Sequence, residues 1–126
     1  MANELQIGLS LTFNKGGASV QKAETFNVDV TGEAYESGTV TTTNDTAVDL
    51  ANGVSTITNV GFVYIKLLSV PTASTYLKWG FNNSVTSGKL KAGESCILRM
   101  PDTEENCWIK ASAAENVVVE YILIED

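Results

Sequence analysis

The stretch from residue 60 to residue 126 is a series of short apolar runs separated by turn residues, and this pattern constrains the fold more than any other feature. The runs are rich in Val, Ile, Leu and aromatic residues, and Gly, Pro and Asn stand between them, which is typical of strands and turns. Because the runs follow one another closely, we expect an antiparallel meander in which each strand pairs with the next. The expected strands are residues 61–70, 75–81, 95–100, 106–113 and 116–124.

The first thirty residues predict two more strands. Residues 4–13 alternate with period two, which predicts a half-buried strand. A turn at residues 14–17 precedes a second extended stretch at residues 18–30. The apolar residues expected on one face of the first strand are Leu5, Ile7, Leu9, Leu11 and Phe13.

Residues 34–59 are less regular: a turn is expected at Ser37 and Gly38, residues 39–43 are β-branched but polar, and residues 47–50 and 54–57 look like two short strands. Apolar positions nowhere recur at helical spacing for three turns. About eight to ten short strands therefore predict an all-β fold, a two-sheet antiparallel sandwich of jelly-roll-like order. An immunoglobulin-like order is the alternative. We expect residues 1–126 to form a single β-sandwich domain.

Composition narrows the possible partners. The net charge of −7 disfavours nucleic acid, because phosphate binding needs a basic surface. No apolar run approaches the roughly 20 residues that span a bilayer, so no membrane partner is expected. The opening residues lack the basic and apolar regions of a signal peptide, which predicts synthesis in a cytoplasm and reduced cysteines.

The chain carries few groups suited to catalysis. It has no His, so Ser95 or Cys96 would lack the usual base of a nucleophile. Cys96 and Cys107 flank the turn at Pro101 and are expected roughly opposite each other on paired strands. We interpret them as unbridged core residues, a redox pair being the alternative. Three further acids are expected in a solvated loop tip: Asp102, Glu104 and Glu105.

Acids elsewhere raise the question of a metal. Five lie between residues 29 and 49, but they lack the spacing of a calcium-binding EF-hand loop. We therefore predict no catalytic residue, no metal and no cofactor. These five acids are Asp29, Glu33, Glu36, Asp45 and Asp49.

Aromatic and aliphatic side chains suggest contact surfaces instead. Trp79 and Phe81 share a face opposite Tyr76, and with the amides of Asn82 and Asn83 they would suit a sugar platform or a core. Trp108 is exposed if its neighbours Cys107 and Ile109 point inward. The last expected strand, residues 116–124, is apolar on both faces, which suggests that each face is covered. These features predict a homo-oligomer, with candidate interface residues Trp108, Trp79, Val118, Ile122 and Ile124.

Three local patterns together resemble a known group of proteins. They are ANELQIGLSLTFNKGGASV near the start, GFVYIKLLSVPTASTYLKWGFNN in the middle, and KLKAGESCILRM with VVVEYILIED at the end. Their order resembles small virion structural proteins of tailed bacteriophages, including capsid decoration or cement proteins with jelly-roll-like sandwiches. The matching positions are Lys89, Leu90, Gly93 and Glu94 in a turn, and Glu120 and Tyr121 in the last strand. The turn also occurs in cupins, but a cupin enzyme needs His ligands.

The resemblance implies a protein without catalysis or cofactor that binds the major capsid protein lattice and bridges capsid subunits. It would be made in the host cytoplasm and reside on the capsid surface of the virion. Asn3, Glu4 and residues 101–106 are candidate bridging elements. The alternatives are a tail- or fibre-associated β-domain that binds host glycans, and a carbohydrate-binding module.

Overall fold

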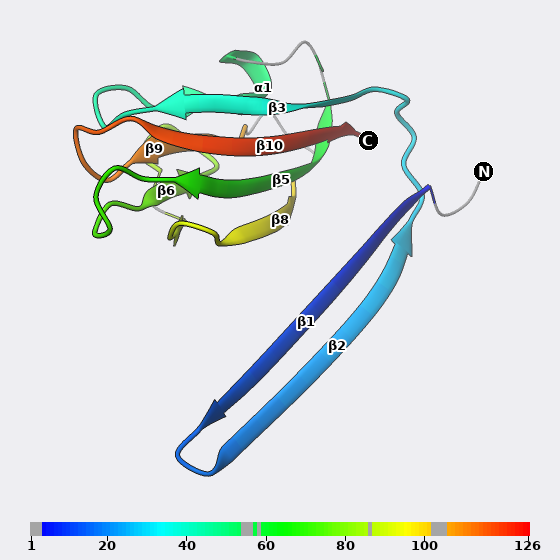
Figure 1. The fold of residues 1–126 in the computed structure, drawn as a ribbon. Coiled ribbons are helices and arrows are strands. Elements are labelled where there is room, and N and C mark those ends of the chain that lie inside the picture. The colour runs from blue at the N-terminus through cyan, green and yellow to red at the C-terminus, as the bar shows by residue number, and fades with distance from the viewer. Residues whose placement is uncertain (1–3, 54–56, 58, 86, 102–105) are drawn as a thin grey trace. The chain divides into compact units, whose positions relative to one another are not determined.

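The computed structural model describes residues 4–53, 57, 59–85, 87–101 and 106–126. Over these residues the chain forms ten strands and one helical turn (Figure 1). It divides into two compact units, residues 1–31 and residues 32–126. The all-β fold class is therefore confirmed. That residues 1–126 fold as one domain stays a prediction.

The first unit is a β-hairpin. Strand β1 (Leu5–Lys15) pairs antiparallel with β2 (Ala18–Val28), from Leu5 opposite Val28 to Lys15 opposite Ala18. Gly16 and Gly17 connect them with φ angles of 59° and 82°. Positive φ at both central residues is what a tight two-residue hairpin turn requires, and glycine adopts it without steric cost.

The second unit contains two four-stranded antiparallel sheets. One has the order β3-β10-β5-β8, which lie side by side in Figure 1, and the other has the order β4-β9-β6-β7. In the first sheet the strands are β3 (Tyr35–Thr42), β10 (Val117–Glu125), β5 (Val60–Ser69) and β8 (Ser95–Arg99). In the second they are β4 (Val48–Asp49), β9 (Trp108–Ala111), β6 (Leu77–Gly80) and β7 (Gly88–Leu90). The helical turn α1 (Leu50–Gly53) follows β4.

The predicted meander is wrong. Among the strands described for this unit, only β6 and β7 are neighbours both in sequence and in a sheet. Strand β5 instead pairs with β8 and β10, because the chain crosses to the other sheet between most successive strands. Alternation within a strand indicates a buried face but not which strand lies beside it, so the pairing was not readable from the sequence. Strand β7 was not predicted, and most of the expected run 54–57 lies outside the described residues.

One hydrophobic core joins the two sheets. The central strands β5 and β10 bury every second side chain, and β6 and β9 meet them with Leu77 and Ile109, both fully buried. Each large aliphatic side chain buried in this way contributes about 1.5–3 kcal/mol to the stability of the fold. The buried side chains that these two strands turn inward are Val63, Ile65, Leu67, Val117, Val119, Tyr121 and Leu123; Phe62, on the outer face of β5, is buried as well.

Two glutamates fasten the ends of β10. Before the strand, Glu115 accepts hydrogen bonds from the hydroxyls of Thr72 and Thr75, each 2.6 Å long, and so ties the β9–β10 connection to the β5–β6 connection. At the far end, Glu125 Oε2 accepts from the backbone N–H groups of Glu33 and Ala34, each at 3.1 Å. These bonds hold β10, a central strand of its sheet, at both ends.

The predicted half-burial of the N-terminal strand is wrong for most of its length. Strand β1 pairs only with β2 in the described structure, and Leu9, Leu11 and Phe13 are 53%, 62% and 50% exposed. Ile7 alone of the predicted face is buried, and Leu5 is half-buried.

No helix in the described part of the chain is long and apolar enough to cross a membrane.

Candidate functional site

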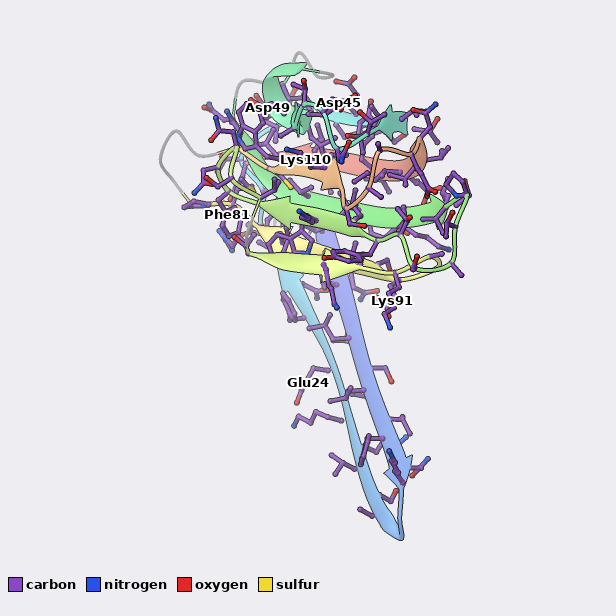
Figure 2. The ribbon with its side chains drawn as sticks, turned by 90° about the vertical axis from the view of Figure 1, so that its left-hand side faces the viewer. Glu24, Asp45, Asp49, Phe81, Lys91 and Lys110 are labelled. Atoms are coloured by element: carbon purple, nitrogen blue, oxygen red, sulfur yellow. The ribbon has the colours of Figure 1, made fainter. Side chains whose placement is uncertain are left out.

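The acids considered as calcium ligands do not converge. Among the described residues, no three His, Cys, Asp or Glu side chains come together as a metal site. The buried Asp49 accepts hydrogen bonds from the backbone N–H of Ala51 and from Asn106 Nδ2, each at 3.0 Å. Figure 2 labels Asp49 and Asp45 beside the helical turn. Asp49 therefore holds α1 against the segment leading into β9.

The cysteines are unbridged, as predicted, but they do not lie on paired strands. Cys96 is in β8 opposite Ile65, whereas Cys107 precedes β9 in the other sheet. The chain crosses the sandwich between them. Both thiols belong to the core or pack against it, and burial raises the pKa of Cys107 to about 12 and that of Cys96 to about 11. Thiols that stay protonated are poor nucleophiles.

An apolar surface of the sandwich lies on the outer side of the β3-β10-β5-β8 sheet. Directly paired residues share a face of a sheet, so the register groups Tyr35 with Ile124 and groups Ile122 with Tyr64 and Ile97. Tyr35 is 75% exposed and Ile97 is 42% exposed. We call these residues the sandwich patch: Tyr35, Tyr64, Ile97, Ile122 and Ile124.

Charged groups border the sandwich patch. Arg99 lies over the ring of Phe62, 5.1 Å from the centroid, and its Nη2 is 3.2 Å from Asp126 Oδ2. On the other border, desolvation and a hydrogen bond with Glu120 raise the pKa of Tyr64. An apolar centre with a polar rim is typical of protein interfaces.

A second apolar surface covers one side of the hairpin. The register places Ile7 beside Phe26 and Phe13 beside Val20 on the same face. The opposite face pairs polar or small residues, such as Gln6 with Asn27, whose side chains lie 3.4 Å apart. We call the apolar side the hairpin face: Leu5, Ile7, Leu9, Leu11, Phe13, Val20, Phe26 and Val28. One acid and one base interrupt it, Glu24 (labelled in Figure 2) and Lys22, joined at 2.6 Å.

The structure places Trp79 in the core rather than on a flat platform. Its ring meets that of Phe81 edge to face, with centroids 5.9 Å apart, and both side chains pack against the core. Tyr76 lies on the opposite side, as predicted, where Lys89 Nζ is 5.1 Å from its ring centroid. Asn82 Oδ1 accepts from the N–H of Ser84 at 2.9 Å, so this side chain shapes its own turn.

The other predicted contact residues are dispersed. Trp108 is half-buried on β9, between Cys107 and Ile109, which are both buried, and therefore lies on the outer side of the second sheet. Val118 shares the outer face of β10 with Ile122 and Ile124 but lies beyond Glu120, opposite Thr41 and Ser69. Of the five predicted contact residues, the sandwich patch thus contains only Ile122 and Ile124. Asn3 and residues 102–105, two of the suggested bridging elements, lie outside the described residues.

Sequence reasoning missed Tyr35, Tyr64 and Ile97. The signal for Tyr64 was present, because Phe62, Tyr64 and Lys66 alternate with the fully buried Val63, Ile65 and Leu67. Tyr35 and Ile97 join the patch only through strand register, which the sequence does not reveal.

Comparison with known proteins adds no relative. The chain matches no protein-family model, no curated protein and no solved structure.

Proposed function

We propose that this chain is a non-enzymatic structural protein of a tailed-bacteriophage virion, and that it decorates the capsid as a cement protein. The observation that carries the proposal is the presence of two apolar surfaces on two separate units, the sandwich patch and the hairpin face. A protein that bridges subunits needs at least two attachment surfaces, and many weak contacts of this kind sum through multivalency. The resemblance of residues 1–31 and 60–126 to virion proteins supports the same function.

The strand order supports the jelly-roll part of the proposal. Each sheet mixes early and late strands, as β3 beside β10 and β4 beside β9, and eight strands make up the two sheets. Jelly rolls are double-sheet folds of eight strands and are common in viral capsid proteins and lectins. Because capsid proteins and lectins share this fold, the choice between a capsid protein and a glycan-binding protein depends on the surface residues.

The alternative is a tail or fibre domain, or a carbohydrate-binding module, that binds glycans. Tyr76 and Trp108 on the outer side of the β4-β9-β6-β7 sheet are the residues that favour it. Trp79 lies against the core and Asn82 is engaged in its turn, so the aromatic and amide platform expected around them is weakened. The cement proposal uses more of the exposed apolar surface and is therefore preferred.

Binding to phage particles tests the proposal. Particles assembled without the protein are incubated with purified wild-type protein, with Ile97→Glu, and with Thr41→Glu as a matched control on the same sheet face. Ile97 is at the edge of the sandwich patch, whereas Thr41 lies opposite Val118, beyond Glu120. We expect Ile97→Glu to weaken binding by about 2 kcal/mol, which is roughly 30-fold, and Thr41→Glu to bind like wild type. Equal binding by both variants would contradict the role of the patch.

A further inference from the structure

Most of the hairpin face is left uncovered in the described structure, beyond the buried Ile7. Side chains on the hairpin face remain substantially exposed: Val20 is 53% and Phe26 is 44% exposed, in addition to Leu9, Leu11 and Phe13. The reverse face carries residues such as Thr12 and Gln21, which pair across the two strands and are exposed. The hairpin therefore has one side suited to water and one side suited to burial.

A hairpin of this kind needs a cover. An isolated two-stranded ribbon is at best marginally stable in water. Its five most exposed apolar side chains leave roughly 100 Å² each uncovered, about 500 Å² together, which equals the largest apolar patch of a typical monomer. Two such faces brought together would bury about 1,000 Å², the lower limit for a specific interface.

Charge indicates which partner fits. The chain carries −7 overall, but residues 5–28 contain two lysines and one glutamate, so two copies can meet at the hairpin without the repulsion that the net charge of the whole chain implies. Two of these three charges, Lys22 and Glu24, form an ion pair in the middle of the hairpin face. A two-fold axis through this point would place Lys22 of each copy against Glu24 of the other.

We propose that the hairpin face is a self-association surface, and that two copies of this chain pack their hairpins face to face. The two ribbons would form a small four-stranded sandwich with sheets about 10 Å apart, their polar sides in water. The paired Lys22 and Glu24 would set the register and exclude partners that lack a complementary pair. This inference does not need the capsid proposal, but it bears on it: a hairpin face buried in a dimer is not available to bind the capsid, and the dimer would then attach through its two sandwich patches.

The first test is sedimentation equilibrium of the full chain from about 1 to 100 μM. Wild-type protein is expected to dimerise, and Leu11→Glu to raise the dimer Kd by 30-fold or more. Thr12→Glu, one residue away on the polar face, is expected to stay within threefold of wild type. Leu11 lies directly across from Lys22, so a glutamate there is compatible with the hairpin itself. Circular dichroism checks that both variants keep the β fold.

Charge reversal provides the second test, which does not depend on the loss of apolar area. Lys22→Glu and Glu24→Lys are each expected to raise the dimer Kd at least tenfold, and the double variant to return to within threefold of wild type. A protein that is monomeric throughout this concentration range overturns the proposal. That result is expected if each hairpin face is covered by its own chain. Association that ignores Leu11→Glu and the charge reversals also overturns it, because copies would then meet elsewhere. Dimerisation is measured with the hairpin variants and capsid binding with Ile97→Glu, so the failure of one proposal can be told from the failure of the other.

Discussion

The indole ring of Trp79 lies directly over Gly88, its partner across the β6–β7 pair. A Cβ built on Gly88 would be 2.6 Å from Cε2 and Cζ2 of the ring, closer than non-bonded carbon atoms approach. The glycine thus admits the tryptophan to its position against the core, and a glycine beneath an aromatic side chain is a recognised way to support a short edge strand.

Replacing Gly88 with Val should therefore destabilise the sandwich. The added side chain forces Trp79 out of its position and disturbs its contact with Phe81, and overpacking of this kind costs about 1–3 kcal/mol. Chemical denaturation measures the change. Gly8→Ala is the control, because a Cβ at this strand glycine comes no nearer than 3.9 Å to another atom. Equal stability of Gly88→Val and wild type would show that the ring readily moves aside.

Glu115 should make the stability of the sandwich sensitive to acid. Hydrogen bonds from Thr72 and Thr75 lower the pKa of this carboxyl below its ordinary value of 4.5. A carboxyl with a lowered pKa in the folded state stabilises the fold above its unfolded pKa, and the effect is lost as pH falls through the folded value. Wild-type Tm should therefore fall more steeply below pH 4.5 than the Tm of Glu115→Gln.

The control for this experiment is Glu33→Gln, which removes the same charge near the opposite end of β10. It should retain the wild-type acid dependence. If Glu115→Gln and Glu33→Gln have identical Tm profiles from pH 7 to pH 3, the threonine contacts do not contribute to stability.

The cysteines should show the opposite pH dependence. Burial raises the pKa of Cys107 to about 12 and of Cys96 to about 11, whereas an unfolded thiol titrates near 9. The unfolded state therefore ionises first, and the free energy of unfolding should fall as pH rises above 9. A Cys96→Ala, Cys107→Ala double variant should lose roughly 1–3 kcal/mol of unfolding free energy at pH 7 and show less of this decline.

The burial of both thiols also predicts slow chemical modification. A thiol reagent at pH 8 should react slowly with the native protein and should titrate two thiols in denaturant. Rapid reaction of both thiols in the native state would contradict their burial.

The hairpin turn gives a prediction about the first unit alone. Gly17 has a φ of 82°, which a β-branched residue adopts only with strain of about 1–3 kcal/mol. Gly17→Val should therefore accelerate amide hydrogen exchange in β1 and β2 by about tenfold or more. Gly17→Asn is the control, since asparagine tolerates positive φ and should exchange much like wild type. Unchanged exchange in Gly17→Val would mean that the turn does not determine hairpin stability.

The sequence indicated where most strands lie and which of their faces are apolar, but not which strands pair with each other. Period-two alternation correctly indicated the all-β class, the two apolar sides of β10, and the opposite directions of Tyr76 and Trp79. It did not reveal that β5 pairs with β8 and β10, because register between distant strands depends on packing across the whole sandwich. For the same reason the sequence predicts paired strands for Cys96 and Cys107, whereas Cys96 lies in β8 and Cys107 precedes β9 of the other sheet.

The hairpin shows a second limit. The alternation of Leu5 to Phe13 identified an apolar face but not that most of this face would remain exposed. The sandwich patch was only partly predictable. Ile122 follows from the alternation of its own strand, whereas Ile97 joins the patch only through the register of β8 against β5.

The most direct test of the proposed function is to locate the protein in phage particles and challenge those particles. Virions assembled with and without the protein are imaged by cryo-electron microscopy and then exposed to heat or low salt. The proposal predicts density for this fold on the outer capsid surface, bridging neighbouring capsid subunits, and earlier disruption of particles that lack it. Density confined to the tail, or equal survival of both kinds of particle, would contradict the cement function and favour the glycan-binding alternative.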